Sequence, residues 1–138
     1  MIATKDTPIG FELPEVKREM VQQIAGSRLW GRANPFHWDP QFAEEMGLPG
    51  PAITGTIMDG YIQEMLVNFF GHAFFSNSTI QCKYISPIFT GDILTVKGIV
   101  EEKSPEDSGV RLKVKVWVEK EGMTERPVLV GNASAVVK

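Results

Sequence analysis

The spacing of hydrophobic positions changes along the chain, from a helical pattern in the first half to alternation in the second half. Residues 52–71, AITGTIMDGYIQEMLVNFFG, are mostly apolar around the helical circumference and end on a glycine. This pattern predicts a long helix that is buried on nearly all sides. Later segments rich in Val and Ile predict a meander of four antiparallel strands, at 78–85, 92–102, 109–120 and 128–138.

Two shorter helices are predicted before the long one. Val16, Met20 and Ile24 are four residues apart with charges between them, and a proline stands at the start, which predicts an amphipathic helix over 14–24. The segment 39–47, DPQFAEEMG, has Asp at the N-cap, Pro at the first helical position and Gly after the last turn. These residues predict a two-turn helix.

A long buried helix followed by antiparallel strands predicts an α+β fold, in which an antiparallel β-sheet is wrapped around a long central α-helix. The chain has 138 residues, 43% of them hydrophobic, so we expect a single domain over residues 1–138. The edges of such a small sheet need cover, which a second copy would supply. A dimer is therefore expected.

Charge and cysteine content narrow the classes of partner. There are 14 basic and 17 acidic residues, and the net charge of -3 argues against a nucleic-acid partner. No segment reaches the roughly 20 apolar residues of a membrane span, and the N-terminal residues do not resemble a signal peptide. The lone Cys82 lies in an apolar run, where a buried reduced thiol is expected, and together these features predict a soluble cytoplasmic protein.

The segment WGRANPFHWDP, residues 30–40, contains the strongest candidates for chemistry. Asn34 and Pro35 precede His37 in a loop that leads directly into the predicted capped helix, and scaffolds commonly place reactive groups in such loops. A neutral imidazole suits proton transfer near neutral pH. No metal site is expected, because two histidines 35 residues apart and one cysteine lack the clustered spacing that metal ions need.

The stretch NPFHWDPQFAEEMGLPGPAITG resembles the signature of MaoC-like hydratases and dehydratases, including (R)-specific enoyl-CoA hydratases. That signature reads Asp-x-Asn-Pro-x-His-x-Asp-x-x-x-Ala and closes on a glycine. Six residues fall into register with it, namely Asn34, Pro35, His37, Asp39, Ala43 and Gly55. The stretch YISPIFTGDILTVKGIV is similar to the strand-turn-strand element of the same family, so the resemblance covers the chain from about residue 14 onward.

The resemblance implies a hotdog fold, usually dimeric, with sites near the subunit interface. It also implies hydration of α,β-unsaturated acyl thioesters or dehydration of 3-hydroxyacyl thioesters, carried on CoA or on acyl carrier protein, with no other cofactor. The catalytic candidates are His37, Asn34 and Arg32. The substrate-binding candidates are Thr54 and Gly55, since the backbone N–H of Gly55 near a helix start suits the thioester oxygen.

Arg32 departs from the signature, because the family has an aspartate five residues before the histidine. Loss of a positioned acid or base typically costs about 10²- to 10⁴-fold in rate. A guanidinium ~4 Å from His37 would also oppose its protonation. Asp59 or Glu64 of the long helix could supply a substitute carboxylate.

Three functions therefore remain open. The chain could be a hydratase or dehydratase in which Arg32 polarises water or binds a carboxylate of the acyl chain. It could be a non-catalytic acyl-CoA-binding subunit, paired with a paralogous MaoC-like chain that has the complete motif. It could also be a thioesterase or thioester-binding module that uses the same cleft.

Overall fold

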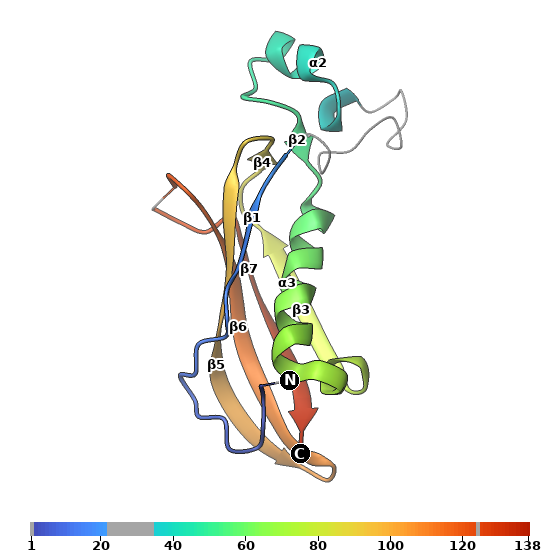
Figure 1. Cartoon of the computed structure of the whole chain (residues 1–138), viewed down its shortest axis with the longest axis vertical. Coiled ribbons are helices and arrows are strands. Elements are labelled where there is room, and N and C mark those ends of the chain that lie inside the picture. Colours follow the sequence, from blue (N-terminus) through green and yellow to red (C-terminus); the bar gives the residue numbers. More distant parts are fainter. Residues whose placement is uncertain (1, 22–34, 124) are drawn as a thin grey trace.

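The computed structural model describes residues 2–21, 35–123 and 125–138. The long helix α3, Gly55–Phe70, lies along one face of a five-stranded antiparallel sheet (Figure 1). The strands run in the order β1-β5-β6-β7-β3, with bounds Val16–Glu19, Ile93–Glu106, Gly109–Lys120, Leu129–Val137 and Ser78–Tyr84. The predicted α+β architecture, an antiparallel sheet wrapped around one long helix, is confirmed.

The sheet differs from the predicted four-strand meander in the position of β3. Strands β5, β6 and β7 do form consecutive hairpins, but β3 pairs with β7 at the far edge and not with β5, the next strand of this sheet along the chain. The free edge of β5 is occupied by β1, where Val16 pairs with Val96. Between β3 and β5 the chain crosses past the start of α3 and forms β4, Ile88–Phe89, which pairs with β2, Ala52–Ile53.

The predicted helix over 14–24 is wrong in its described part, where residues 16–19 form strand β1. Side chains four residues apart share a face in a helix, but they also share a face in a strand, whose period is two. Val16 and Met20 are buried accordingly, while Lys17 and Glu19 are exposed. Arg18, two residues from Val16, points toward α3 and binds Glu64, with Nη2 2.5 Å from Oε1.

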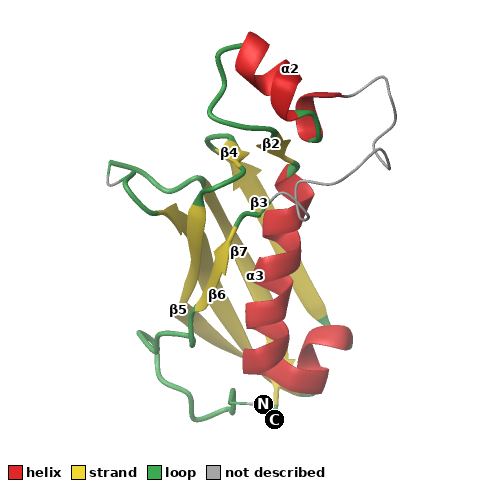
Figure 2. Ribbon diagram, turned by 45° about the horizontal axis from the view of Figure 1, so that its top comes forward, coloured by secondary structure: helices red, strands yellow, loops and turns green. Residues whose placement is uncertain are grey.

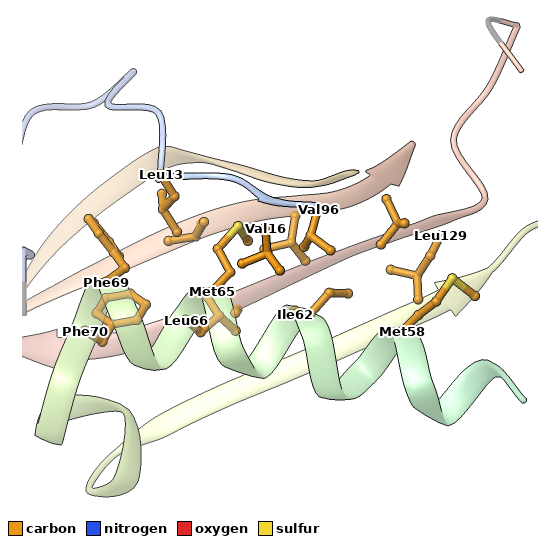
Figure 3. Packing of buried hydrophobic residues seen from close by; sticks show 14 of the residues in the cluster. Leu13, Val16, Met58, Ile62, Met65, Leu66, Phe69, Phe70, Val96 and Leu129 are labelled. Atoms are coloured by element: carbon orange, nitrogen blue, oxygen red, sulfur yellow. The ribbon is translucent and has the colours of Figure 1, made fainter. Parts of the chain in front are cut away.

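Helix α3 begins at Gly55, three residues later than predicted, and buries one face only (Figure 3). The buried side chains are Met58, Ile62, Met65, Leu66, Phe69 and Phe70. The opposite face carries the exposed Thr56, Gly60, Gln63 and Asn68, so the expectation of burial on nearly all sides is wrong. The helix ends at Gly71 and continues as the 3-10 turn η3, Gly71–Phe75. Within the described ranges, no helix combines the length and apolar character needed to span a membrane.

An overhanging segment, residues 35–51, projects beyond the sheet at the N-terminal end of α3 (Figures 1 and 2). It contains the 3-10 turn η2, Pro35–His37, and helix α2, Pro40–Glu45. Asp39 caps α2, since its Oδ1 accepts the backbone N–H of Gln41 at 3.0 Å. Gly47 follows the helix with a φ of 73°, a conformation that favours glycine. The predicted caps of this helix are confirmed.

Candidate functional site

A cavity of about 370 Å³ opens at the N-terminal end of α3. Its walls come from three parts of the chain: Ile53 of β2, the first turn of α3, and residues 84–88, which run from the end of β3 into β4. Gly55, a predicted substrate-binding residue, lines it together with Tyr84 and Ser86. The cavity therefore lies where β2, the start of α3 and the connection from β3 to β4 meet.

The first turn of α3 presents uncapped backbone amides. Thr54 occupies the N-cap position with an extended backbone, but its side chain makes no capping hydrogen bond. Its hydroxyl oxygen instead accepts a hydrogen bond from the Thr56 hydroxyl at 3.2 Å. The first N–H groups of a helix have no acceptor within the helix, and the helix dipole favours negative charge there. The N–H of Gly55 is thus suited to bind a carbonyl oxygen, whereas Thr54 shapes the helix start and is not one of the residues that line the cavity.

Tyr84 lies directly against Gly55, a contact that the sequence did not reveal. A Cβ atom placed on Gly55 would lie 2.7 Å from Cε1 of the Tyr84 ring, closer than real Cβ atoms approach other groups. The hydroxyl of Tyr84 donates a hydrogen bond to Oδ2 of Asp59 at 2.6 Å. This bond, more than burial, raises the pKa of Tyr84 to about 12, so the phenol stays protonated at neutral pH.

The two helix carboxylates considered as substitutes for the family aspartate already have partners. Glu64 forms the ion pair with Arg18, and Oδ2 of Asp59 accepts a hydrogen bond from the Tyr84 hydroxyl. The other oxygen of Asp59, Oδ1, is buried and has no hydrogen-bond partner among the described residues. Cys82, expected to be buried, is half-buried; burial, together with the negative charge of Asp59, raises the pKa of its thiol and keeps it protonated.

A hydrogen bond joins the side chain of His37 to β2, the strand that leads into α3. Its Nδ1 lies 2.8 Å from the carbonyl oxygen of Ala52 in β2, and because a carbonyl can only accept, Nδ1 must carry the hydrogen. In the neutral ring Nε2 then holds the lone pair, as a general base requires. His37 is not among the residues that line the cavity, and the other catalytic candidates, Arg32 and Asn34, lie outside the described residues.

A larger cavity, of about 610 Å³, lies between the β6–β7 turn and β1. Long charged side chains form much of its wall, including Lys17, Glu119 and Arg126, and none of the predicted site residues lines it. In the part of the chain that the structure describes, no three His, Cys, Asp or Glu side chains gather closely enough to hold a metal ion. The cavity at the start of α3 is therefore the better candidate site.

Comparison with known proteins concerns the family and the fold. Residues 10–125 match the family model described as "MaoC like domain". The R-hydratase PhaJ1 from Pseudomonas aeruginosa superposes with a TM-score of 0.77 at 19% identity, covering 96% of this chain and 84% of that one. The (R)-hydratase from A. caviae involved in PHA biosynthesis gives 0.74 at 18% identity, covering 96% and 98%.

A chain of the ChsH1-ChsH2 complex from Mycobacterium tuberculosis is also similar, with a TM-score of 0.72 at 20% identity and coverage of 96% and 99%. Comparison with curated protein sequences finds no match. At such identities the structural likeness shows the fold, and the expected hotdog fold is confirmed.

Proposed function

Because the chain belongs to the MaoC-like domain family, we propose that it hydrates α,β-unsaturated acyl thioesters and dehydrates 3-hydroxyacyl thioesters. The observation that carries the proposal is that Gly55, the first residue of α3, lines a cavity large enough to hold a small acyl group, at a helix start without a side-chain cap. His37, with Nδ1 protonated, is hydrogen-bonded to the carbonyl of Ala52, three residues before Gly55.

The proposed reaction follows from these groups. Nε2 of His37 takes a proton from water while the water oxygen bonds to C3 of the substrate, and the electrons of the double bond move onto the thioester oxygen. The Gly55 amide stabilises that negative charge. The proton then passes to C2, which restores the thioester carbonyl. The substrate is carried on CoA or acyl carrier protein, and the mechanism uses no further cofactor.

The proposal is tested with crotonyl-CoA, whose conjugated double bond absorbs in the near ultraviolet and disappears on hydration. We expect His37→Ala to lower kcat/KM by about 10²- to 10⁴-fold, the usual contribution of a positioned acid or base. His72→Ala is the matched control, because His72 is exposed in η3 at the opposite end of α3 and should leave the rate unchanged. Equal rates for wild type and His37→Ala would refute the proposed role of His37.

A second candidate is the non-catalytic subunit of a two-chain hydratase. Arg32 stands where the family signature has its aspartate, and one structural neighbour comes from a complex of two different chains. In this case the chain binds acyl-CoA and completes the fold of a partner that carries both catalytic residues. The cavity at Gly55 would then hold the ligand without converting it.

The substitution Arg32→Asp separates the two candidates. If the cleft is otherwise intact, restoring the carboxylate raises the hydration rate of the isolated chain about 10²-fold or more. If wild type is already active and Arg32→Asp lowers the rate, Arg32 itself takes part in the reaction. If both are inactive yet both bind crotonyl-CoA, the subunit function is favoured.

A second chain is proposed to pair along β3. This strand forms one edge of the sheet, and no described residue pairs with its outer side. Ile80 and Tyr84 are large side chains on it that are 40% and 49% exposed. Exposed strand edges bind other strands readily, so a second copy or a paralogous chain would cover both the edge and the outer side of the cavity wall at Tyr84.

Light scattering coupled to size exclusion tests this interface. Ile80→Lys places a charge on the proposed contact and should yield monomers, while Ile9→Lys provides the control because Ile9 is even more exposed, at 62%, but lies far from β3 in the N-terminal segment. A wild-type protein that is monomeric at micromolar concentration, alone and with a paralogous chain, would rule the pairing out.

A further inference from the structure

Two buried side-chain oxygens in the described part of the chain have no hydrogen-bond partner, and both belong to residues near Tyr84. One is Oδ1 of Asp59, one turn after Gly55, and the other is Oγ of Ser86, two residues after Tyr84. Buried polar atoms in native proteins are nearly always hydrogen-bonded, so an unpaired one points to a partner that is absent. Asp59 already accepts a hydrogen bond from Tyr84 at its other oxygen, whereas the side chain of Ser86 has no hydrogen-bond partner among the described residues.

The position of Ser86 is fixed by its backbone. The N–H groups of Ile85 and Ser86 both lie within hydrogen-bond distance of the Val128 carbonyl oxygen, at 2.9 and 3.2 Å. Pro87 follows, and a residue before proline is restricted to extended conformations. Ser86 is only 7% exposed. Its hydroxyl is therefore held on a rigid part of the wall, where only rotation about χ1 remains to orient it.

Ser86 and Gly55 line the same cavity. We propose that the hydroxyl of Ser86 is the second hydrogen-bond donor to the thioester oxygen of a bound acyl thioester, together with the backbone N–H of Gly55. This inference rests on the proposed function and adds a catalytic residue to it. A carbonyl oxygen accepts two hydrogen bonds, and both strengthen as negative charge collects on it during enolate formation.

The neighbouring hydroxyl of Tyr84 is unsuited to this role. Its hydrogen is already donated to Asp59, and turning it toward the cavity would leave a carboxylate with both oxygens unpaired. The Ser86 hydroxyl loses no hydrogen bond when it turns toward a ligand, because this hydroxyl makes none among the described residues. Of the hydroxyls on this wall, Ser86 is thus the one available to the substrate.

The test uses acetoacetyl-CoA, a thioester that releases a C2 proton to solvent and forms an enolate with strong near-ultraviolet absorbance. A site that donates hydrogen bonds to the thioester oxygen raises the enolate fraction of the bound compound. This readout needs no turnover, so it applies even to a chain that does not hydrate anything. We expect Ser86→Ala to lower the enolate-to-keto ratio of bound acetoacetyl-CoA about tenfold to a hundredfold.

Ser134→Ala is the matched control. Ser134 is also buried, but its Oγ bonds Thr79 at 2.7 Å and Arg111 at 2.8 Å, away from the cavity. We expect Ser134→Ala to lower the melting temperature and leave the enolate ratio unchanged. Ser86→Ala should lower the enolate ratio and leave the melting temperature unchanged, since the Ser86 hydroxyl makes no hydrogen bond within the described protein. If Ser86→Ala binds and enolises the probe like wild type, or loses stability like Ser134→Ala, the inference is wrong while the proposed function stands. Wild type that does not bind the probe overturns both.

Discussion

Replacing Gly55 with alanine tests the contact on which the cavity wall depends. The new Cβ would lie 2.7 Å from Cε1 of Tyr84, and ordinary contact begins at 3.4 Å, so the ring must retreat by about 0.7 Å. The Tyr84 hydroxyl lies 2.6 Å from Asp59 Oδ2, and a shift of this size weakens or breaks that bond. Overpacking typically costs about 1–3 kcal/mol, and we expect the lower end because the half-exposed ring can swing outward.

The pKa of Tyr84 reports whether the ring has moved. In wild type the Asp59 carboxylate raises this pKa to about 12, and in Gly55→Ala it should fall toward its ordinary value of 10.0. A raised pKa means that the bond stabilises the fold below about pH 10 and that this stabilisation is lost as the pH rises through about 12. The stability difference between wild type and variant should therefore shrink over that interval.

Tyrosinate absorbance is a clean assay because the chain has only two tyrosines. Tyr61 also has a raised pKa, mainly from burial, so wild type should show little tyrosinate at pH 10, while circular dichroism verifies that the protein remains folded. Gly60→Ala is the control on the same helix: nothing lies within 4 Å of its Cβ, and alanine should stabilise the helix by about 0.5–1 kcal/mol. A Gly55→Ala protein with wild-type titration and stability would show that Tyr84 does not pack on Gly55.

Three further substitutions test the fold by urea denaturation. Gly131→Ala should lower the free energy of unfolding by about 3 kcal/mol or more, since the new Cβ would lie 2.3 Å from the backbone oxygen of Gln81 and would push β3 away from β7. A urea midpoint equal to that of wild type would contradict this pairing. Asp39→Ala should cost about 1 kcal/mol through loss of the α2 cap, and no change would mean that the cap is not formed in solution. Arg18→Gln should cost less than about 1 kcal/mol, because its ion pair with Glu64 is well exposed, and a larger loss would indicate a buried role.

The elements that sequence predicted best are those fixed by neighbouring residues. Helix α2 is determined by Asp39, Pro40 and Gly47 within nine positions, and the structure reproduces each cap. Strand β1 was predicted wrongly because Val16 and Met20 fit a helix and a strand equally well, and the choice is made by β5, some eighty residues later. The position of β3 was missed for the same reason, since strand order depends on which edges other strands occupy.

The candidate site was predicted in part. The signature led to Gly55 and His37; the structure places Gly55 in the cavity wall, whereas His37 lies outside it in η2, hydrogen-bonded to Ala52 of β2. Tyr84 was missed because its contacts with Gly55 and Asp59 join residues 25 or more positions apart. One local signal was available: Gly55 and Asp59 are four residues apart and so share a face of α3. A glycine on that face indicates that another group approaches closely.

The short pairing of β2 with β4 positions both the His37 imidazole and the Gly55 amide. The carbonyl of Ala52 accepts a hydrogen bond from Nδ1 of His37, and Ala52 pairs with Phe89. Ile53 pairs with Ile88 and leads into the start of α3 at Gly55. A shift of this two-residue pairing would carry the imidazole and the amide in the same direction and preserve their spacing. Ile88 is buried, pairs with Ile53 and also lines the cavity, so substitutions there should lower turnover by disturbing the β2–β4 pairing as well as the cavity wall.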